Sequence, residues 1–423
     1  MKEFFNFIKS SPTAFHTVEN IRRRLISEGY TELYENTAWE LVLGKGYFTV
    51  RGGSAIIAFR MTEGAESFMI AASHADSPSF KVKISEETVG AYCRLPVEKY
   101  GGMIMYSWFD RPLGVAGRIA VRTQEGISTR LVNLDNDIMT IPSVSIHQNR
   151  SVNEGFKPNP AKDMIPLLGT GAVKGDFRAT VAKSAGALPE DIISHDLFAY
   201  VREEPHLVGL ENEIILSPRL DDLECVFAST EAFLSSKNSR ANPVLAVFDN
   251  EEVGSATLAG ADSSFLPDVL KRIAGSEERY IRMLTSSMVV SADNAHALHP
   301  NSPELSDAEN APVLGGGVVI KYNGNKRYAT DAVSSALFME IASAAGVKTQ
   351  SYYNRADMPG GSTLGSILNT QLAVRTVDIG LPQLAMHSAV ESADKRDLTE
   401  MKNALTAFFE KRLEARGNFI KIV

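Results

Sequence analysis

Apolar runs of strand length alternate with helical stretches along the second half of this chain. The strand-like runs are Val244–Phe248, Met288–Ala292, Val318–Tyr322 and Leu372–Ile379, and helical spacing marks Asp221–Leu234, Ser263–Ala274, Asp331–Ala345 and Leu398–Arg416. A strand that is apolar at successive positions is buried on both faces, so helices must cover the sheet from both sides. The alternation therefore predicts an α/β fold with a doubly wound, mixed sheet.

Residues 1–84 are expected to contribute to the same sheet. Residues 4–29 predict two amphipathic helices with a break at Ser10–Pro12. Strand-like runs follow at Tyr47–Val50, Ser54–Phe59 and Ser67–Ala72. The last run is apolar enough for burial on both faces, so we expect it near the centre of the sheet.

The pattern changes between residues 85 and 215. Gly117–Val121 and Ile127–Leu134 predict a hairpin across a glycine-containing turn, and four prolines between 142 and 166 interrupt regular structure. A chain of 423 residues also exceeds one ordinary core. We therefore expect a catalytic domain built from residues 1–84 and 216–423, with a β-rich domain inserted at 85–215.

Charge and cysteine content exclude several classes of protein. The net charge is −8, whereas a nucleic-acid-binding surface requires a basic stripe. No apolar run approaches the roughly 18 residues that cross a bilayer, and the N-terminus lacks the apolar core of a signal peptide. Cys93 and Cys225 are the only cysteines, which excludes a disulfide framework and a cysteine zinc finger. We expect a cytoplasmic protein without nucleic-acid or membrane partners.

Metal-binding residue types recur where the predicted strands end. His74 and Asp76 follow the run at 67–72, Glu251 and Glu252 follow Val244–Phe248, Asp293 follows Met288–Ala292, His387 comes soon after Leu372–Ile379, and Asp221 opens a helix. In doubly wound sheets, ligands bind beyond the carboxyl ends of the strands. The recurrence therefore predicts one polar site at that edge of the sheet.

Each of these residues also has an ordinary structural explanation. Asp221 could cap the helix that it opens, Asp293 could form a turn, and Glu251 could lie in a solvated loop. His74 and His387, taken singly, are typical of histidines that bond a neighbouring group. Because all of these positions fall at one edge of one sheet, a shared site explains them better than separate coincidences.

Histidines and carboxylates without cysteine suit zinc, manganese or cobalt. Two histidines with several carboxylates are enough for two metal ions, and one carboxylate can bridge ions about 3.5–4 Å apart. Asp221 is the candidate bridge, and Asp76 is the candidate partner that orients the imidazole of His74. Gly361 and Ser362 could bring backbone N–H groups to a substrate carbonyl.

Longer stretches of the chain resemble a known family of enzymes. They are Ser10–His16, Ser73–Pro78, Trp108–Arg111, Ser217–Asp222, Asp249–Ser255, Ser291–His296, Tyr328–Thr330 and Pro382–Ser388. In order and length these stretches resemble the aspartyl aminopeptidase family of dinuclear zinc exopeptidases. The resemblance extends over nearly the whole chain.

The resemblance implies a role for each matching residue. His74 and His387 would each bind one of two zinc ions, Asp221 would bridge them, and Glu252 and Asp293 would complete the two sites. Glu251 would be the general base, which holds the proton of a water that bridges the ions.

The resemblance also implies a substrate and an assembly. Lys321 matches a lysine that pairs with the acidic side chain of the substrate, so peptides with a free N-terminal Asp or Glu would be preferred. Residues 85–215 would form the dimerisation domain of a hollow dodecamer. His147 would reach from that domain into the active site of a neighbouring subunit.

Two other functions stay open. A related two-metal aminopeptidase or deacylase for neutral or N-acylated residues would use the same ligands, and only Lys321 and its surroundings would distinguish it. An inactive, self-assembling scaffold is the second alternative, although a scaffold has no use for an unpaired cluster of carboxylates.

Overall fold

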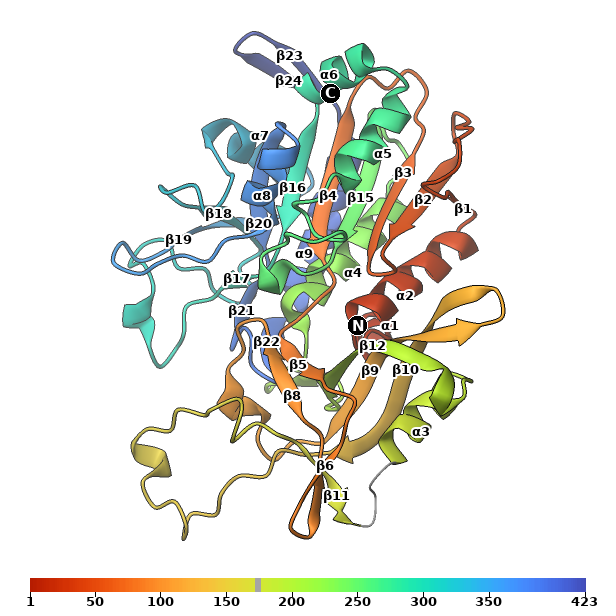
Figure 1. Cartoon of the computed structure of the whole chain (residues 1–423). Helices are drawn as coiled ribbons and strands as arrows, with labels where there is room; N and C mark the ends of the chain where they lie inside the picture. Colours follow the sequence, from red (N-terminus) through yellow and green to blue (C-terminus); the bar gives the residue numbers. More distant parts are fainter. Residues whose placement is uncertain (172–175) are drawn as a thin grey trace.

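The computed structural model describes residues 1–171 and 176–423 and contains a nine-stranded sheet (Figure 1). The strand order is β1-β2-β3-β15-β4-β16-β20-β18-β19. In that order the strands are Thr31–Glu32, Gly46–Arg51, Ala55–Arg60, Asn242–Phe248, Phe68–His74, Met288–Ala292, Arg375–Gly380, Val318–Tyr322 and Thr349–Tyr353. Strands β15, β4, β16 and β20 are parallel, whereas β3 pairs antiparallel with β15 and β18 pairs antiparallel with β20. The predicted mixed sheet is confirmed.

Helices cover both faces of this sheet. One face carries α1 (Lys2–Ser10), α2 (Ala14–Ser27), α4 (Leu220–Ser235), α7 (Ala332–Ala344) and α9 (Lys395–Phe409), and the other carries α5 (Phe265–Ala274), α6 (Glu277–Thr285) and α8 (Leu364–Gln371). The pleat of β4 divides its side chains between two cores, with Met69 and Ala71 in the first and Ile70 and Ala72 in the second. The predicted doubly wound architecture is thus confirmed.

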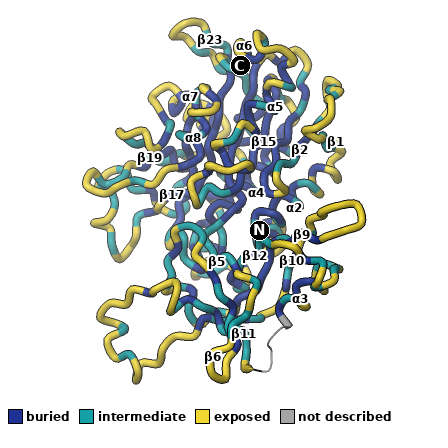
Figure 2. Tube along the Cα trace, in the orientation of Figure 1, coloured by how far each residue is buried: buried dark blue, intermediate teal, exposed yellow. Residues whose placement is uncertain are grey.

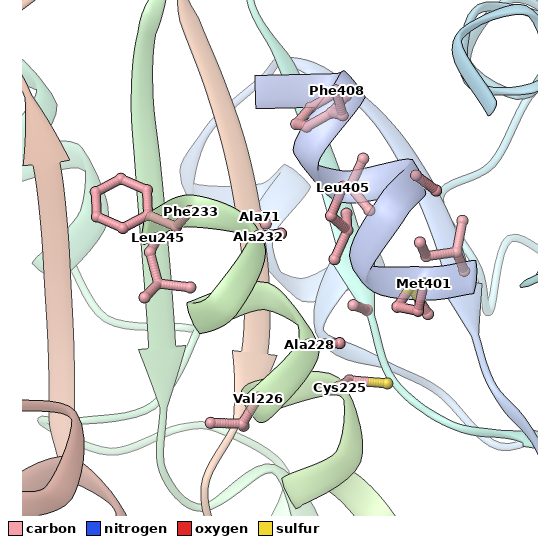
Figure 3. Packing of buried hydrophobic residues seen from close by; sticks show 14 of the residues in the cluster. Ala71, Cys225, Val226, Ala228, Ala232, Phe233, Leu245, Met401, Leu405 and Phe408 are labelled. Carbon is pink, nitrogen blue, oxygen red and sulfur yellow. The ribbon is translucent and has the colours of Figure 1, made fainter. Parts of the chain in front are cut away.

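Helices α4 and α9 pack side by side over β4 and β15 (Figure 3). Ala228 and Ala232 give α4 a flat surface, against which Met401, Leu405 and Phe408 of α9 can pack closely. All five side chains are buried, so truncating Leu405 to alanine would cost about 2–5 kcal/mol of stability. Since α4 begins at Leu220, this packing also fixes the position of the residues at its N-terminus.

A second body of structure is rich in antiparallel strands. One sheet has the order β10-β9-β12-β5-β8, with strands Gly126–Met139, Leu113–Thr123, Ile192–Val201, Ser79–Val82 and Val97–Tyr100. A smaller sheet, β11-β7-β6, contains Leu167–Thr170, Tyr92–Arg94 and Glu87–Val89, and helix α3 spans Asp176–Ser184. The predicted hairpin is confirmed, because Ile127 pairs with Arg122 and Leu134 with Val115. The antiparallel sheet also recruits β5, which precedes residue 85; the domain boundaries themselves stay a prediction.

A third sheet of five or more strands, called the third sheet below, was not predicted from the sequence and brings together residues from distant parts of the chain. Its order is β13-β14-β22-β21-β17, with strands His206–Val208, Ile214–Ser217, Glu391–Asp394, Pro382–Leu384 and Ala295–His296. Near the C-terminus, β23 (Leu413–Arg416) and β24 (Phe419–Ile422) form a hairpin.

Two predicted boundaries are wrong. The run Leu372–Ile379 becomes a strand only at Arg375, because Leu372 caps helix α8 and is buried there. The helix predicted at Leu398–Arg416 ends at Phe409, and its last four residues pair with β24 instead. Both errors have one cause, since a short segment can fit a helical or a strand period until its pairing partner is known.

The buried residues are concentrated in the sheet and the helices that cover it (Figure 2). The inner strands β3, β15, β4, β16 and β20 are buried at nearly every position, whereas most residues from Ser143 to Glu154 are exposed. Among the described residues, no helix combines the length and the apolar character needed to cross a membrane.

Candidate metal centre

Three adjacent parallel strands, β15, β4 and β16, deliver acidic and imidazole side chains to one edge of the sheet. His74 is the last residue of β4, Asp293 directly follows β16, and Glu251 and Glu252 lie in a short 3-10 turn (Glu251–Val253) after β15. Parallel neighbours end at the same edge, so these side chains converge. The prediction that these strand ends meet is confirmed.

Asp221 and His387 reach the same edge from the third sheet. Asp221 follows β14 at the start of α4, and His387 follows β21. Oδ1 of Asp221 lies 3.5 Å from Nε2 of His74, and its Oδ2 lies 3.3 Å from Nε2 of His387. Each carboxylate oxygen therefore faces a different imidazole, which is the arrangement required of a bridging ligand.

The cluster contains two ligand sets that share Asp221. The first is His74, Asp221, Asp222 and Asp293, and the second is Asp221, Glu252 and His387; within each set the ligand atoms lie within 4.8 Å of one another. In the described part of the chain, Oδ1 of Asp221 and Oε1 of Glu252 are buried and accept no hydrogen bond. Buried carboxylate oxygens without donors need a cation, so this donor set fits zinc.

Electrostatic crowding within the cluster also favours a bound cation. Burial and neighbouring carboxylates raise the pKa of Glu251 to about 8 and that of Glu252 to about 7. Burial opposes the charged form of His387, but Asp221 and Glu252 outweigh it and raise the pKa of this imidazole to about 12. Without a metal, protons must therefore supply part of the positive charge that the carboxylates require.

Asp76 connects His74 to the glutamate turn. Its Oδ1 lies 3.3 Å from Nδ1 of His74, as expected of a residue that orients the imidazole. The backbone N–H groups of Glu251 and Glu252 also donate to Asp76, at 3.1 and 3.2 Å, and the hydroxyl of Tyr100 donates at 2.7 Å. Asp76 thus holds a histidine and both glutamates in one network.

Helix capping does not explain the pair Asp221–Asp222. Arg219 occupies the N-cap of α4, and both aspartates have non-helical backbone angles. Oδ2 of Asp222 instead accepts the backbone N–H of His74 at 3.1 Å. Its side chain is fully buried, which raises its pKa well above the usual range and favours the neutral acid.

No sequence pattern indicated Glu391, which holds two of the predicted ligands. Its carboxylate accepts the N–H of Asp221 at 3.0 Å and that of His387 at 2.7 Å. Glu391 lies in β22 of the third sheet, so only the pairing of β14, β22 and β21 reveals its place.

Lys321 lies beside the cluster and is buried. Its Nζ is 3.3 Å from Oδ2 of Asp293, donates to the carbonyl of Asn294 at 3.1 Å and lies 5.3 Å from the ring centre of Tyr328. Burial opposes its charge, but Asp293 and other neighbours outweigh burial and raise the pKa. The ammonium therefore stays charged.

Three predicted substrate-binding residues are not joined to the cluster within the described ranges. His147 is exposed in the segment that follows β10. Gly361 and Ser362 are exposed in the segment between β19 and α8. No hydrogen bond links any of them to the candidate metal ligands in the residues that the structure describes, so their roles stay predictions.

Comparisons with known proteins identify the family of this chain. The family model for aminopeptidase I zinc metalloproteases (M18) matches residues 7–409. A probable M18 family aminopeptidase 2 from Clostridium acetobutylicum is 42% identical over 96% of this chain and 98% of its own length. A probable M18 family aminopeptidase 2 from Pseudomonas aeruginosa is 38% identical, and the match covers 96% of each chain.

Solved structures show the same fold. A chain in the Ape4 and Nbr1 complex superposes with a TM-score of 0.93 and 34% identity, over 97% of this chain and 85% of that chain. The mApe1 dodecamer of S. cerevisiae gives a TM-score of 0.85 and 26% identity, over 97% of this chain and 96% of that chain. The chain therefore belongs to the M18 family of zinc metallo-aminopeptidases.

Proposed function

We propose that this protein is a two-zinc aminopeptidase that removes N-terminal Asp or Glu from peptides with a free N-terminus. The observation that carries the proposal is the position of Asp221, whose two oxygens face His74 and His387. One zinc would be held by His74, Asp221 and Asp293. The other would be held by His387, Asp221 and Glu252. Manganese or cobalt would also suit these ligands.

Two bound zinc ions would polarise the scissile carbonyl, acidify the attacking water and neutralise charge in the transition state. Glu251 is the proposed general base. Burial raises its pKa in the metal-free protein, and the positive charge of two bound zinc ions would lower it again, so its carboxylate could accept the proton of the attacking water. It then passes this proton to the nitrogen of the leaving amine. Asp76 holds the backbone of Glu251 and keeps the base in place.

The proposed preference for acidic N-terminal residues rests on Lys321. A buried ammonium rewards a substrate carboxylate, whereas a neutral side chain would leave it without that partner. Asp293 competes for this ammonium in the metal-free protein. Coordination of Asp293 to zinc would weaken that competition and release Lys321 toward the substrate.

The contact between Lys321 and Asp293 also favours a second candidate function. If the lysine serves only to hold this carboxylate, the enzyme is a two-metal aminopeptidase for neutral N-terminal residues. The ligand set would be unchanged, and only the order of substrate preference would differ.

The assembly is also a proposal. Oligomeric relatives such as the mApe1 dodecamer support a dodecamer here, with residues 85–215 as the dimerisation domain. The exposed segment that carries His147 would then reach a neighbouring subunit. Size-exclusion chromatography with light scattering tests the assembly, and a monomeric, fully active enzyme would contradict it.

The deciding experiment compares hydrolysis of p-nitroanilides of Asp, Glu, Leu, Ala and N-acetyl-Asp, with and without a chelator. Chelator-sensitive cleavage that favours free Asp and Glu supports the proposal. Chelator-sensitive cleavage that favours Leu supports the second candidate. Absence of turnover in zinc-loaded protein would leave the scaffold as the remaining function.

A further inference from the structure

The segment Tyr100–Gly102, at the end of edge strand β8, leaves the antiparallel sheet and meets the metal cluster. Tyr100 is the last residue of β8. Its hydroxyl donates to Oδ2 of Asp76 at 2.7 Å and accepts a hydrogen bond from Nδ2 of Asn250 at 2.9 Å. Tyr100 therefore links Asp76, which holds the turn at Glu251–Val253, to Asn250, which begins that turn.

Gly102 holds a predicted zinc ligand. Its carbonyl oxygen lies 2.6 Å from Nδ1 of His387. A carbonyl only accepts, so Nδ1 of His387 carries the proton, and Nε2 is left to face Asp221 and Glu252. The N–H of Ile104 donates to the carbonyl of His387 at 2.9 Å, which fixes the backbone as well.

Gly101 approaches the cluster so closely that a side chain there would press on Glu252. Its φ is +74°, and a Cβ there would lie 3.1 Å from Cβ of Glu252 and 3.4 Å from Cα of Pro78. The backbone of this segment thus packs directly against Glu252. A side chain at this position would push the glutamate away from the place where it faces His387.

We propose that Tyr100–Gly102 is a positioning segment of the catalytic centre, which sets the glutamate turn through Tyr100 and His387 through Gly102. The antiparallel sheet then contributes to catalysis within its own chain, apart from any role in assembly. This inference rests on the proposed function, because it concerns the residues assigned there as base and ligands.

Tyr100 touches no proposed ligand directly, so its loss separates positioning from metal binding. Without its hydroxyl, Asp76 still faces His74 but loses its donor from β8. The turn that carries Glu251 then loses the brace between Asp76 and Asn250. Small misplacements of a catalytic base cost large factors in rate while substrate binding is retained.

The first test is Tyr100→Phe in the zinc-loaded full-length protein. The ring keeps its edge contact with Phe198, so packing is retained. We expect kcat to fall about 10–100-fold, with KM and the zinc content unchanged. Tyr200→Phe is the matched control, because the hydroxyl of Tyr200 bonds Asn133 in the same sheet and does not touch the cluster.

The second test is Gly101→Ala, compared with Gly90→Ala. Both glycines have positive φ, but a Cβ at Gly90 meets nothing within 4 Å. Backbone strain is therefore matched, and only Gly101→Ala presses on Glu252. We expect this variant to bind fewer zinc ions by mass spectrometry, whereas Gly90→Ala keeps the wild-type zinc content and kcat.

The outcomes separate this inference from the proposed function. A wild-type enzyme without aminopeptidase activity would overturn the proposed function itself. An active wild type with an unchanged kcat in Tyr100→Phe would overturn only the positioning role. Equal losses in Tyr100→Phe and Tyr200→Phe would also overturn it, because they would show a general effect on the sheet.

Discussion

Nζ of Lys321 lies 3.3 Å from Oδ2 of Asp293, so the cation assigned to substrate recognition also contacts a proposed zinc ligand. The two residues come from β18 and from the end of β16, which are not neighbours in the sheet. The contact allows two readings of the lysine, as a substrate-binding group or as a support for Asp293. These readings predict different kinetics.

Lys321→Met tests which reading holds. If Lys321 recognises the substrate, the ratio of kcat/KM for Asp over Leu substrates should fall by about 10–100-fold, since a charge-assisted hydrogen bond contributes roughly 1.5–3 kcal/mol. Uniform loss on every substrate, with reduced zinc content, would show support of Asp293 instead. Lys326→Met is the control, because Lys326 bonds the carbonyl of Thr330 and does not touch the cluster.

Glu251→Gln should separate chemistry from metal binding. The amide keeps the size of the side chain but cannot take a proton, so kcat should fall about 10²–10⁴-fold while zinc is retained. Glu252→Gln is the matched comparison in the same turn. It should lose zinc, because Oε1 of Glu252 lies 3.2 Å from Nε2 of His387 and the substitution removes this carboxylate. A Glu251→Gln enzyme with near-normal kcat would eliminate Glu251 as the base.

Removal of zinc should destabilise the fold as well as abolish activity. The cluster buries carboxylate oxygens of Asp221 and Glu252 that accept no hydrogen bond among the described residues, and a cation bound only by the folded state stabilises it. At a thousandfold excess over Kd the contribution is about 4 kcal/mol. Differential scanning fluorimetry with and without chelator measures this effect, and an unchanged Tm would argue against a buried metal site.

The pH dependence of stability should reverse when zinc is bound. Burial raises the pKa of Glu251 to about 8 and those of Glu252 and Asp249 to about 7. The metal-free fold therefore binds more protons than the unfolded chain, in which carboxyls titrate near pH 4. Its free energy of unfolding should fall as the pH rises from about 5 to 8, as these carboxyls lose their protons.

Zinc competes with the same protons, so the stability added by zinc should rise over that range. Unfolding by urea at about pH 5.5 and about pH 8, with chelator or with zinc, measures two quantities. The first is the change with pH in the free energy of unfolding of the metal-free protein, and the second is the change with pH in the stability that zinc adds. A metal-free protein that becomes more stable toward pH 8 would contradict the predicted loss of stability. An equal stabilisation by zinc at both pH values would contradict the predicted competition between zinc and protons.

The sequence predicted the doubly wound sheet because strand and helix periods are local properties. Runs such as Val244–Phe248 are apolar at every position, and a strand of that kind is stable only between two layers of helices. The strand ends after this run and after Met288–Ala292 were therefore predictable, and so was the placement of Glu252 and Asp293 at the same edge of the sheet.

Tertiary structure alone decided how these residues are held. Asp76, Tyr100, Asn250 and Glu391 form hydrogen bonds between segments far apart in the chain, and no local period predicts such pairs. The sequence by itself determined which side chains offer ligands and at which strand ends they stand. Only the folded chain decided their mutual distances, because the third sheet and the segment after β8 must dock before Asp221 and His387 face each other.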